Sequence, residues 1–411
     1  MKQLKIAAIA FLSLLILLLC VTLGVSLATG GNGFGLGFGS GSVVVRSDYS
    51  LVLEKEIPAK DIRSLKIDYS MTSNDVFFYA GEGEDILIRE YMNYTPNENK
   101  LTSVNKSGSE LIIKGAKRTF LFFFSIRSGG AYTEIYLPAG FAESLDDIQV
   151  KTSSGKQDSE IAFDMKNKFE FSSVSGDIHF PGIAASKAEG STVSGCILID
   201  SLAAKRNSFS VISGDVTFKQ SKGELALSST SGNIWLNDQQ GDLDISTVSG
   251  DITLAKVSGN MNLSTTSGEI RLQEGKGRLE TDSISGDARI GSLEGAFTMS
   301  ATSGELVIDE GKGYGNAETV SGDVQLFLEA LEGDLYVSTT SGNVSLKLPE
   351  TSDLTLDYDS TSGRCRTFFD EAVTYGKKEH SAKGSYGNGA HEITVNTISG
   401  DLDITDYTIT P

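Results

Sequence analysis

The chain has 411 residues, 54 of them acidic and 35 basic, which gives a formal net charge of −19 at pH 7. Such an acidic surface repels phosphate groups, which argues against nucleic acid and anionic lipid headgroups as partners. Glycine is frequent, at 45 residues, and cysteine is nearly absent, at 3, a composition that agrees with an exported surface protein.

Residues 1–29 predict a transmembrane anchor. The stretch from Ile6 to Ala28 is uncharged, and its 23 residues would span about 34 Å as a helix, enough to cross a bilayer core of ~30 Å. Lys2 and Lys5 precede it, so we expect a single-pass protein of the cell membrane with a cytoplasmic N-terminus and an extracytoplasmic remainder. A cleaved signal peptide that ends at Ala28 is the alternative.

Residues 30–42 are mostly glycine and predict a flexible tether. Residues 43–149 follow with degenerate alternation that still indicates β-structure. Within them, Thr72-Ser-Asn-Asp75 copies a corner motif of the later chain with Asn74 in place of glycine, and Asn tolerates left-handed backbone better than most residues. We predict that residues 43–149 cap or begin the repetitive part that follows.

Residues 150–411 contain a regular repeat. From Gly214 to Gly322 a glycine occupies every ninth position, and every second one follows a serine. Two unlike corners therefore alternate, and the full unit is about 18 residues long. A fixed period of about 20 residues is typical of a solenoid.

Each 18-residue unit predicts two short strands. After Gly241, apolar residues alternate at Leu243 and Ile245, and the alternation resumes in the opposite phase at Ile252 and Leu254. A phase flip across a bend keeps both strands facing one interior. We expect glycine at the corners because tight bends often require φ > 0.

The sequence thus predicts an all-β fold, a parallel β-solenoid of the β-helix or β-roll type with two-strand coils of about 18 residues. The corner motif alternates between Val-Ser-Gly and Thr-Ser-Gly, which leaves a 36-residue coil of four strands open. The inward positions match from each unit to the next and favour the shorter coil.

The repeat becomes irregular after Gly322. A step of 37 residues separates Gly363 from Gly400 and contains a polar insert near residues 375–389. We predict that this insert is a loop on one coil.

The chemistry-bearing residues give little sign of a reaction centre. Cys196 and Cys365 are separated by about nine coils, some 40 Å at ~4.7 Å per coil, too far for a disulfide, and both are expected to be buried. His179, His380 and His391 lack metal-ligand spacing. Aspartates that follow the corner glycines suggest calcium, but the calcium-binding nonapeptide is missing and turn aspartates more often bond to backbone. We predict no catalytic residue, metal or cofactor.

Outward positions of the second strand supply the candidate ligand contacts. They carry Thr217, Trp235, Thr253, Arg271 and Arg289 on successive units. Trp235, the single tryptophan, could stack on a sugar ring. Arg271 and Arg289 should lie on adjacent coils near Glu269 and Asp287; a solvated charged face is the simpler interpretation.

The corner motifs resemble a known family. The ladder of Thr-Val-Ser-Gly-Asp-Ile and Thr-Thr-Ser-Gly-Asn-Val, preceded by Asp68–Val76 and by Glu134–Pro138, is similar to the bacterial putative-adhesin family of β-solenoid surface proteins. The resemblance covers about residues 50 to 408. It implies a β-solenoid at the cell surface, with some members membrane-anchored and linked to envelope stress, and it brings no catalytic residues.

The leading hypothesis is therefore a non-enzymatic, membrane-tethered, extracytoplasmic β-solenoid that acts as an adhesin or binds the cell envelope. Its partners would be the membrane, through residues 6–28, and a cell-wall polymer or surface glycan. One alternative is a regulatory component of an envelope stress response that contacts a membrane sensor protein. A second alternative is a polysaccharide-active lyase or hydrolase, which needs a carboxylate pair within ~10 Å in an outer groove.

Overall fold

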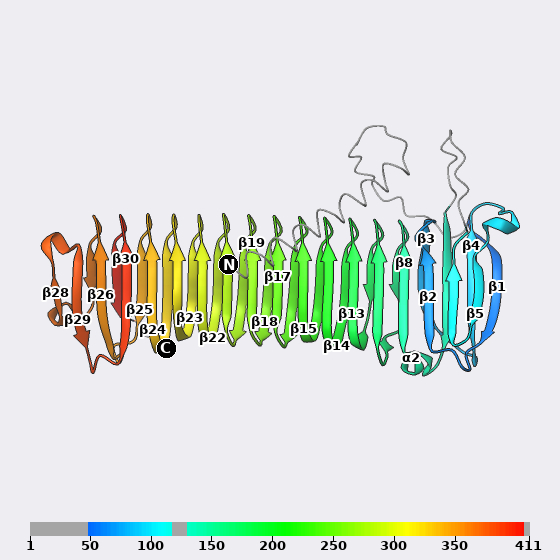
Figure 1. The fold of residues 1–411 in the computed structure, drawn as a ribbon, viewed down its shortest axis with the longest axis horizontal. Helices are drawn as coiled ribbons and strands as arrows, with labels where there is room; N and C mark the ends of the chain where they lie inside the picture. The colour runs from blue at the N-terminus through cyan, green and yellow to red at the C-terminus, as the bar shows by residue number, and fades with distance from the viewer. Residues whose placement is uncertain (1–47, 117–129, 407–411) are drawn as a thin grey trace, which may run out of the picture. The chain divides into compact units, whose positions relative to one another are not determined.

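A computed structural model describes residues 48–116 and 130–406. Across these residues 31 strands are hydrogen-bonded into one continuous sheet that winds into a parallel β-solenoid (Figure 1). The predicted anchor at residues 6–28 and the tether at residues 30–42 lie outside the described residues. No helix within the described ranges has the length and apolar character of a membrane span.

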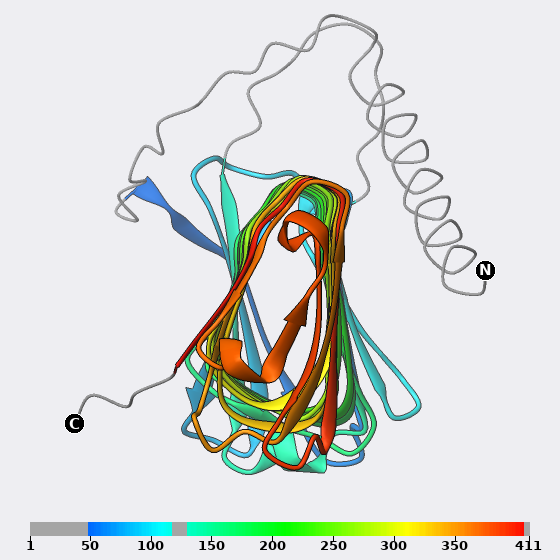
Figure 2. The same ribbon diagram turned by 90° about the vertical axis from the view of Figure 1, so that its left-hand side faces the viewer.

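The regular part consists of stacked two-strand coils, about 11 turns in all with a spacing of about 19 residues. Viewed along the axis, the coils superimpose with two long faces (Figure 2). Some strands continue around one corner and so belong to both faces. The strands of this part are β8 (Asp147–Thr152), β9 (Gln157–Ser159), β10 (Phe163–Asp164), β11 (Lys168–Ser173), β12 (Ile178–Phe180), β13 (Ile183–Thr192), β14 (Ile197–Val211), β15 (Val216–Ser229), β16 (Ile234–Gln240), β17 (Leu243–Thr247), β18 (Ile252–Ser258), β19 (Met261–Thr265), β20 (Ile270–Lys276), β21 (Leu279–Ser283), β22 (Ala288–Ala301), β23 (Leu306–Thr319), β24 (Val324–Thr339) and β25 (Val344–Leu348).

The pairing register settles the coil length. Ile234 of β16 lies opposite Ile252 of β18, and Leu243 of β17 lies opposite Met261 of β19. In each pair the partner is 18 residues further along the chain. The corner hydrogen bond from Asp251 N to Asn233 Oδ1 also joins residues that are 18 apart. The predicted 18-residue coil is therefore confirmed, and the 36-residue alternative is wrong.

The core is the interior between the two faces. The predicted inward columns are buried, with Ile234, Ile252 and Leu254 at 0% exposure. Toward the N-terminal side the same columns hold phenylalanines in contact with one another, from Phe78 to Phe218, with ring centroids 4.9–6.5 Å apart. Burial of these rings removes a large apolar area from water, which favours folding.

Glycine at the Ser-Gly corners is required by close stacking. A Cβ built on Gly250 would lie 2.0 Å from the carbonyl oxygen of Gly232 in the neighbouring coil, and its φ is not left-handed. The expectation of φ > 0 is therefore wrong at these corners. It is correct at opposite corners such as those of Gly241 and Gly277, which both have φ of +123°.

The N-terminal side of the solenoid is covered by antiparallel strands. On one face β1 pairs with β4 and β4 with β7, and on the other β5 pairs with β6, all antiparallel. Asn74 occupies a corner position here, but its φ is not in the left-handed region. The tolerance of Asn for left-handed backbone therefore does not explain why Asn replaces glycine at this corner. The elements are β1 (Ser50–Pro58), β2 (Ser64–Tyr69), β3 (Asn74–Gly81), β4 (Asp85–Met92), η2 (Glu98–Lys100), β5 (Ser103–Ser107), β6 (Glu110–Lys114), β7 (Ala131–Pro138) and α2 (Phe141–Ser144).

The C-terminal side departs from the prediction of a loop. The polar insert contains β29, which pairs antiparallel with β26, and the coils that follow are not stacked in sequence order. A strand forms there because the edge of β26 would otherwise leave its backbone groups unpaired. The elements are β26 (Leu354–Ser360), β27 (Cys365–Thr367), η3 (Asp370–Ala372), β28 (Val373–Tyr375), η4 (Lys377–Glu379), β29 (Ser381–Tyr386), β30 (His391–Thr397) and β31 (Leu402–Asp406).

Candidate functional site

The predicted ligand contacts lie in one straight column, here called the arginine column. It consists of outward side chains from β15, β16, β18, β20 and β22, each opposite the next in the parallel register: Thr217, Trp235, Thr253, Arg271 and Arg289. Successive members are one strand spacing apart, about 4.8 Å. Sequence spacing therefore placed all three candidate contacts on a common line, with Thr253 between Trp235 and Arg271.

The arginine column is accessible to a ligand. Trp235 is 37% exposed, and the side chains of Arg271 and Arg289 are 51% and 48% exposed. The two neighbours of Trp235 in the column, Thr217 and Thr253, are short side chains. An indole in this position can stack on a flat apolar surface such as a sugar ring.

Carboxylates hold the two guanidinium groups. Arg271 pairs with Glu269, while Arg289 Nη2 lies 2.5 Å from Glu305 Oε2 and 3.7 Å from Asp287 Oδ2. Arg289 Nε also lies 3.8 Å from Glu269 Oε1, so the pairs form a network across three coils. Such exposed pairs add little stability, but the network restricts the arginine side chains.

A second polar network continues on the same face toward the N-terminal side. His179 Nδ1 lies 2.8 Å from Asp158 Oδ1, and His179 Nε2 lies 3.9 Å from Asp200 Oδ2. Lys156 and Lys219 lie 2.6 and 2.7 Å from these two carboxylates. Although burial acts to raise it, hydrogen bonds from Lys156 and His179 hold the pKa of Asp158 below its usual range.

This network was not predicted from the sequence, because only one of its two steps follows the coil spacing. Asp158 lies directly opposite His179, 21 residues away along the chain. On the other side His179 lies opposite Leu198, so Asp200 stands two positions further along β14. In residues 48–116 and 130–406 no group of three His, Cys, Asp or Glu side chains is arranged to hold a metal ion. His380 is engaged elsewhere, with its Nδ1 2.7 Å from the carbonyl oxygen of Gly363.

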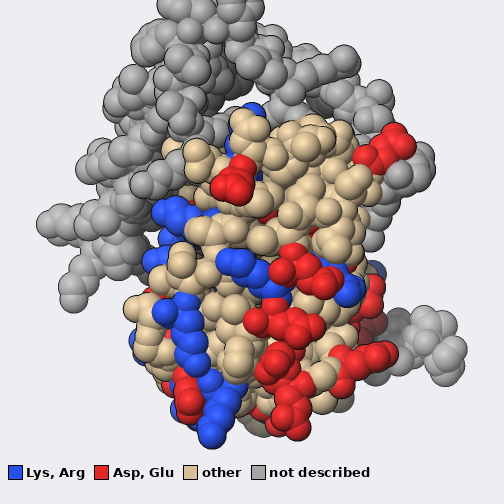
Figure 3. Space-filling model, turned by 90° about the vertical axis from the view of Figure 1, so that its right-hand side faces the viewer, with Lys and Arg blue, Asp and Glu red and all other residues tan. Residues whose placement is uncertain are grey.

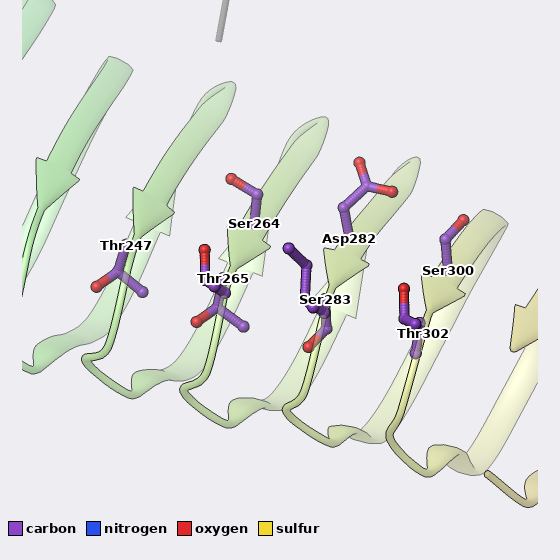
Figure 4. Close-up of a pocket in the computed structure, with 10 residues that line it drawn as sticks. Thr247, Ser264, Thr265, Asp282, Ser283, Ser300 and Thr302 are labelled. Carbon is purple, nitrogen blue, oxygen red and sulfur yellow. The ribbon is translucent and has the colours of Figure 1, made fainter. Parts of the chain in front are cut away.

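The opposite face presents small polar side chains. On it serines follow one another coil by coil, interrupted by one aspartate: Ser172, Ser191, Ser210, Ser228, Ser246, Ser264, Asp282 and Ser300. We call this set the serine column. A shallow hollow of about 360 Å³ lies beside Ser264, Asp282 and Ser300, whose side chains point to the same side of neighbouring strands (Figure 4). Burial and the nearby Glu280 raise the pKa of Asp282.

The corner aspartates have a structural role. Asp251 Oδ1 accepts a hydrogen bond of 2.9 Å from the backbone N–H of Glu269, one coil further on. The same bond recurs at Asp215 Oδ1, which accepts from Asn233 N, and at Asp287 Oδ1, which accepts from Glu305 N, both at 2.9 Å. These carboxylates therefore bond to the backbone of the next coil, not to that of their own turn.

The cysteines differ from expectation in one respect. Cys196 and Cys365 are both free thiols, as predicted, and Cys365 is buried. Cys196 is exposed, because it occupies the position after a corner glycine where other coils carry aspartate or asparagine. Burial raises the pKa of the Cys365 thiol to about 12, so this thiol is unreactive at neutral pH.

Charge is unevenly spread at the N-terminal side of the solenoid. In the view onto this end, Lys and Arg side chains gather in one band and Asp and Glu side chains in another (Figure 3). Separate bands of opposite sign orient an approaching charged partner, with an effect that falls as salt increases.

Comparison with known proteins identifies a family. The model of a family described as Toastrack DUF4097 matches residues 62–281 and 238–405, which confirms the predicted resemblance. No curated protein matches the chain.

Crystal structures of three bacterial proteins are similar to the chain, all at low identity. A putative adhesin of Parabacteroides distasonis is 14% identical, with 67% of this chain and 97% of that chain covered and a TM-score of 0.35. A putative cell adhesion protein of Clostridium sporogenes is 10% identical, with coverage of 87% and 98% and a TM-score of 0.17. A putative adhesin of Parabacteroides merdae is 13% identical, with coverage of 71% and 96% and a TM-score of 0.25.

Proposed function

This chain belongs to the Toastrack family DUF4097, and we propose that it is a non-enzymatic, extracytoplasmic protein that binds a polymer along one face of its solenoid. The arginine column is the observation that carries the proposal. It combines an indole that is 37% exposed with two carboxylate-paired guanidinium groups at one fixed spacing per coil. A cell-wall polymer or a surface glycan offers the matching chemistry, namely sugar rings to stack and hydroxyl or carboxylate oxygens to accept hydrogen bonds.

A solenoid suits a polymer better than a small molecule. Each coil contributes one weak contact, and contacts linked on one rigid body reinforce one another because the second binds at high effective concentration. The arginine side chains are already restricted by Glu269 and Glu305, so less conformational entropy is lost on binding. In the proposal these two carboxylates position the guanidinium groups and take no part in proton transfer.

The proposed location is the outer side of the cell membrane. Residues 6–28 would hold the chain as a single-pass anchor with a cytoplasmic N-terminus, and residues 30–42 would let the solenoid reach the envelope. The motivation is the uncharged stretch that follows Lys2 and Lys5.

The test is cosedimentation of the full chain with purified cell-wall sacculi. Trp235→Ala should weaken binding about 2- to 12-fold, the equivalent of the ~0.5–1.5 kcal/mol of one aromatic contact. The double variant Arg271→Ala with Arg289→Ala should weaken binding further without abolishing it. Tyr336→Ala and Arg278→Ala, on the other face and at its corner, are the matched controls and should bind like the wild type.

Two results would reject this function. Equal losses in the variants and in the controls would show that the arginine column is not the contact surface. Release of new reducing ends from the sacculi, abolished by the double arginine variant, would show a polysaccharide-active enzyme instead.

A further inference from the structure

The coils at the C-terminal side are stacked out of sequence order. Residues 391–406, here the inserted coil, contain β30 and β31, and residues 354–367, here the end coil, contain β26 and β27. β30 pairs with β24 on one side and with β26 on the other, while β31 pairs with β25 and with β27. The inserted coil therefore lies between two coils that precede it in the sequence (Figure 1).

The corners show the same order. Ser399 donates its backbone N–H to Thr340 O at 3.1 Å, and Ser362 donates its own to Ile398 O at 3.0 Å. Leu402 N likewise donates to Arg364 O at 2.8 Å. The inserted coil is thus hydrogen-bonded on both sides, like a coil in the middle of the solenoid.

A short crossing fixes this arrangement. β29 and β30 flank β26, so residues 387–390 must pass over the start of β26 to connect them. Asp353 holds the crossing: its Oδ1 accepts from Asn388 N at 2.8 Å, and its carbonyl oxygen accepts from His391 N at 3.2 Å. Gly387 has φ of +63°, in the left-handed region that the tight turn requires.

Aromatic side chains close the end of the core beside the end coil. The Phe368, Phe369 and Tyr386 rings are in mutual contact, with centroids 4.9–5.4 Å apart. Phe369 is 5% exposed, so this cluster covers apolar surface that would otherwise face water.

We propose that residues 350–406 form an interlocked cap that opens and closes as one cooperative unit. In a solenoid stacked in sequence order, the last coil has one neighbour and opens first. Here the inserted coil cannot leave while the end coil stays in place, and in the observed order the inserted coil is the one coil on which the end coil rests. The device prevents the solenoid from unwinding one coil at a time at this side.

The inward residues alone do not enforce the order. Val344, Leu402 and Cys365 occupy the same column, as do Leu335, Ile393 and Leu356. The end coil could therefore stack directly on β24 and β25 by burying equivalent side chains. The crossing held by Asp353 keeps the end coil apart from β24 and β25, so that the inserted coil fits between them.

Hydrogen exchange of the full chain tests the cooperative unit. Amides of β30 and β31 should be at least as protected as those of β26 and β27. Asp353→Ala should accelerate exchange of both sets together, by about 5- to 30-fold for the loss of one or two net hydrogen bonds. Asp251→Ala, which removes a comparable bond in a middle coil, is the matched control and should leave residues 350–406 unchanged.

Two exchange results would overturn the proposal. One is faster exchange in β30 and β31 than in β26 and β27 of the wild type. The other is acceleration of a single set in Asp353→Ala, which would show that the two coils open independently.

Cysteine pairs at outward positions give a second measurement. Ser338 and Asn396 face each other on β24 and β30, whereas Asp359 lies beyond Asn396 on β26. Ser338→Cys with Asn396→Cys should form a disulfide on mild oxidation of the folded protein, and this disulfide should also slow exchange in the end coil. Ser338→Cys with Asp359→Cys should not, because the partners are two coils or ~9.6 Å apart, beyond the ~7 Å limit. The reverse pattern of disulfides in peptide mapping would refute the interlocked order.

Discussion

Gly250→Ala gives the sharpest test of how the coils are held together. An added Cβ would lie 2.0 Å from the carbonyl oxygen of Gly232, whereas a carbon and an oxygen approach to about 3.3 Å. The two corners must then separate by about 1 Å, which breaks the hydrogen bonds between them. With three such bonds at about 1 kcal/mol each, the free energy of unfolding should fall by about 3 kcal/mol. The bonds are Ser249 N to Thr230 O at 2.9 Å, Asp251 N to Asn233 Oδ1 at 3.0 Å and Ile234 N to Asp251 O at 2.9 Å.

Urea unfolding measures this loss through the fluorescence of Trp235, the single tryptophan, which lies on β16 directly after the Gly232 corner. Gly83→Ala is the matched control, because the nearest atom to its added Cβ is 3.9 Å away and its φ is ordinary. That control should stay within ~0.5 kcal/mol of the wild type. Equal transitions for the two variants would refute the stacking explanation.

Three further predictions rest on the same structure. Asp251→Ala leaves the N–H of Glu269 without its acceptor and should cost about 1–2 kcal/mol in urea unfolding, whereas outward Thr253→Ala should cost less than ~0.5 kcal/mol; equal losses would contradict the assignment of these positions. Burial raises the pKa of Glu90 despite hydrogen bonds from Thr102 and Asn74. The folded protein therefore holds the Glu90 proton more tightly than the unfolded chain does, which stabilises the fold. This stabilisation is fully present below the unfolded pKa of ~4.3 and is lost as pH rises through the folded pKa. The thermal midpoint of the wild type should therefore decrease relative to that of Glu90→Gln as pH rises over this range. A difference between the two midpoints that does not change with pH would contradict this prediction. Cell fractionation should recover the full chain with the membrane through residues 6–28, and a soluble form that starts near Thr29 would show a cleaved signal instead.

The sequence was sufficient to predict the coils. Alternation at Leu243 and Ile245 and its phase flip at Ile252 state which side chains face inward, and a constant 18-residue step makes equivalent positions stack. Each strand needs only local information, because its neighbour in space is the same motif one unit away. For the same reason outward positions such as Trp235 and Arg271 could be placed on one column from their spacing alone.

Contacts between coils were harder to predict. Glycine is required at Gly250 by the carbonyl of the coil beside it, and at Gly241 by such a carbonyl together with its own backbone angle. One repeated letter does not distinguish these causes. Asn74 is informative here, because it stands at the first corner of the ladder. Its own backbone oxygen is the group that a Cβ on Gly155 would meet, while its side chain is free to donate to Glu90 at 2.9 Å.

The order of the coils is the feature that a periodic sequence encodes least. A repeat specifies that any unit can stack on any other, since Val344, Leu402 and Cys365 present the same kind of inward side chain to the same column. What selects one order is the non-repeating part of the chain, which here is the polar insert near residues 375–389. Its β29 strand covers the edge of β26, and the Asp353-bound crossing leaves the following residues only the slot beside β24 and β25. In a solenoid, the order in which coils stack is thus specified by the segments that interrupt the repeat. Substitutions in these segments should alter the stacking order before they alter the coils themselves.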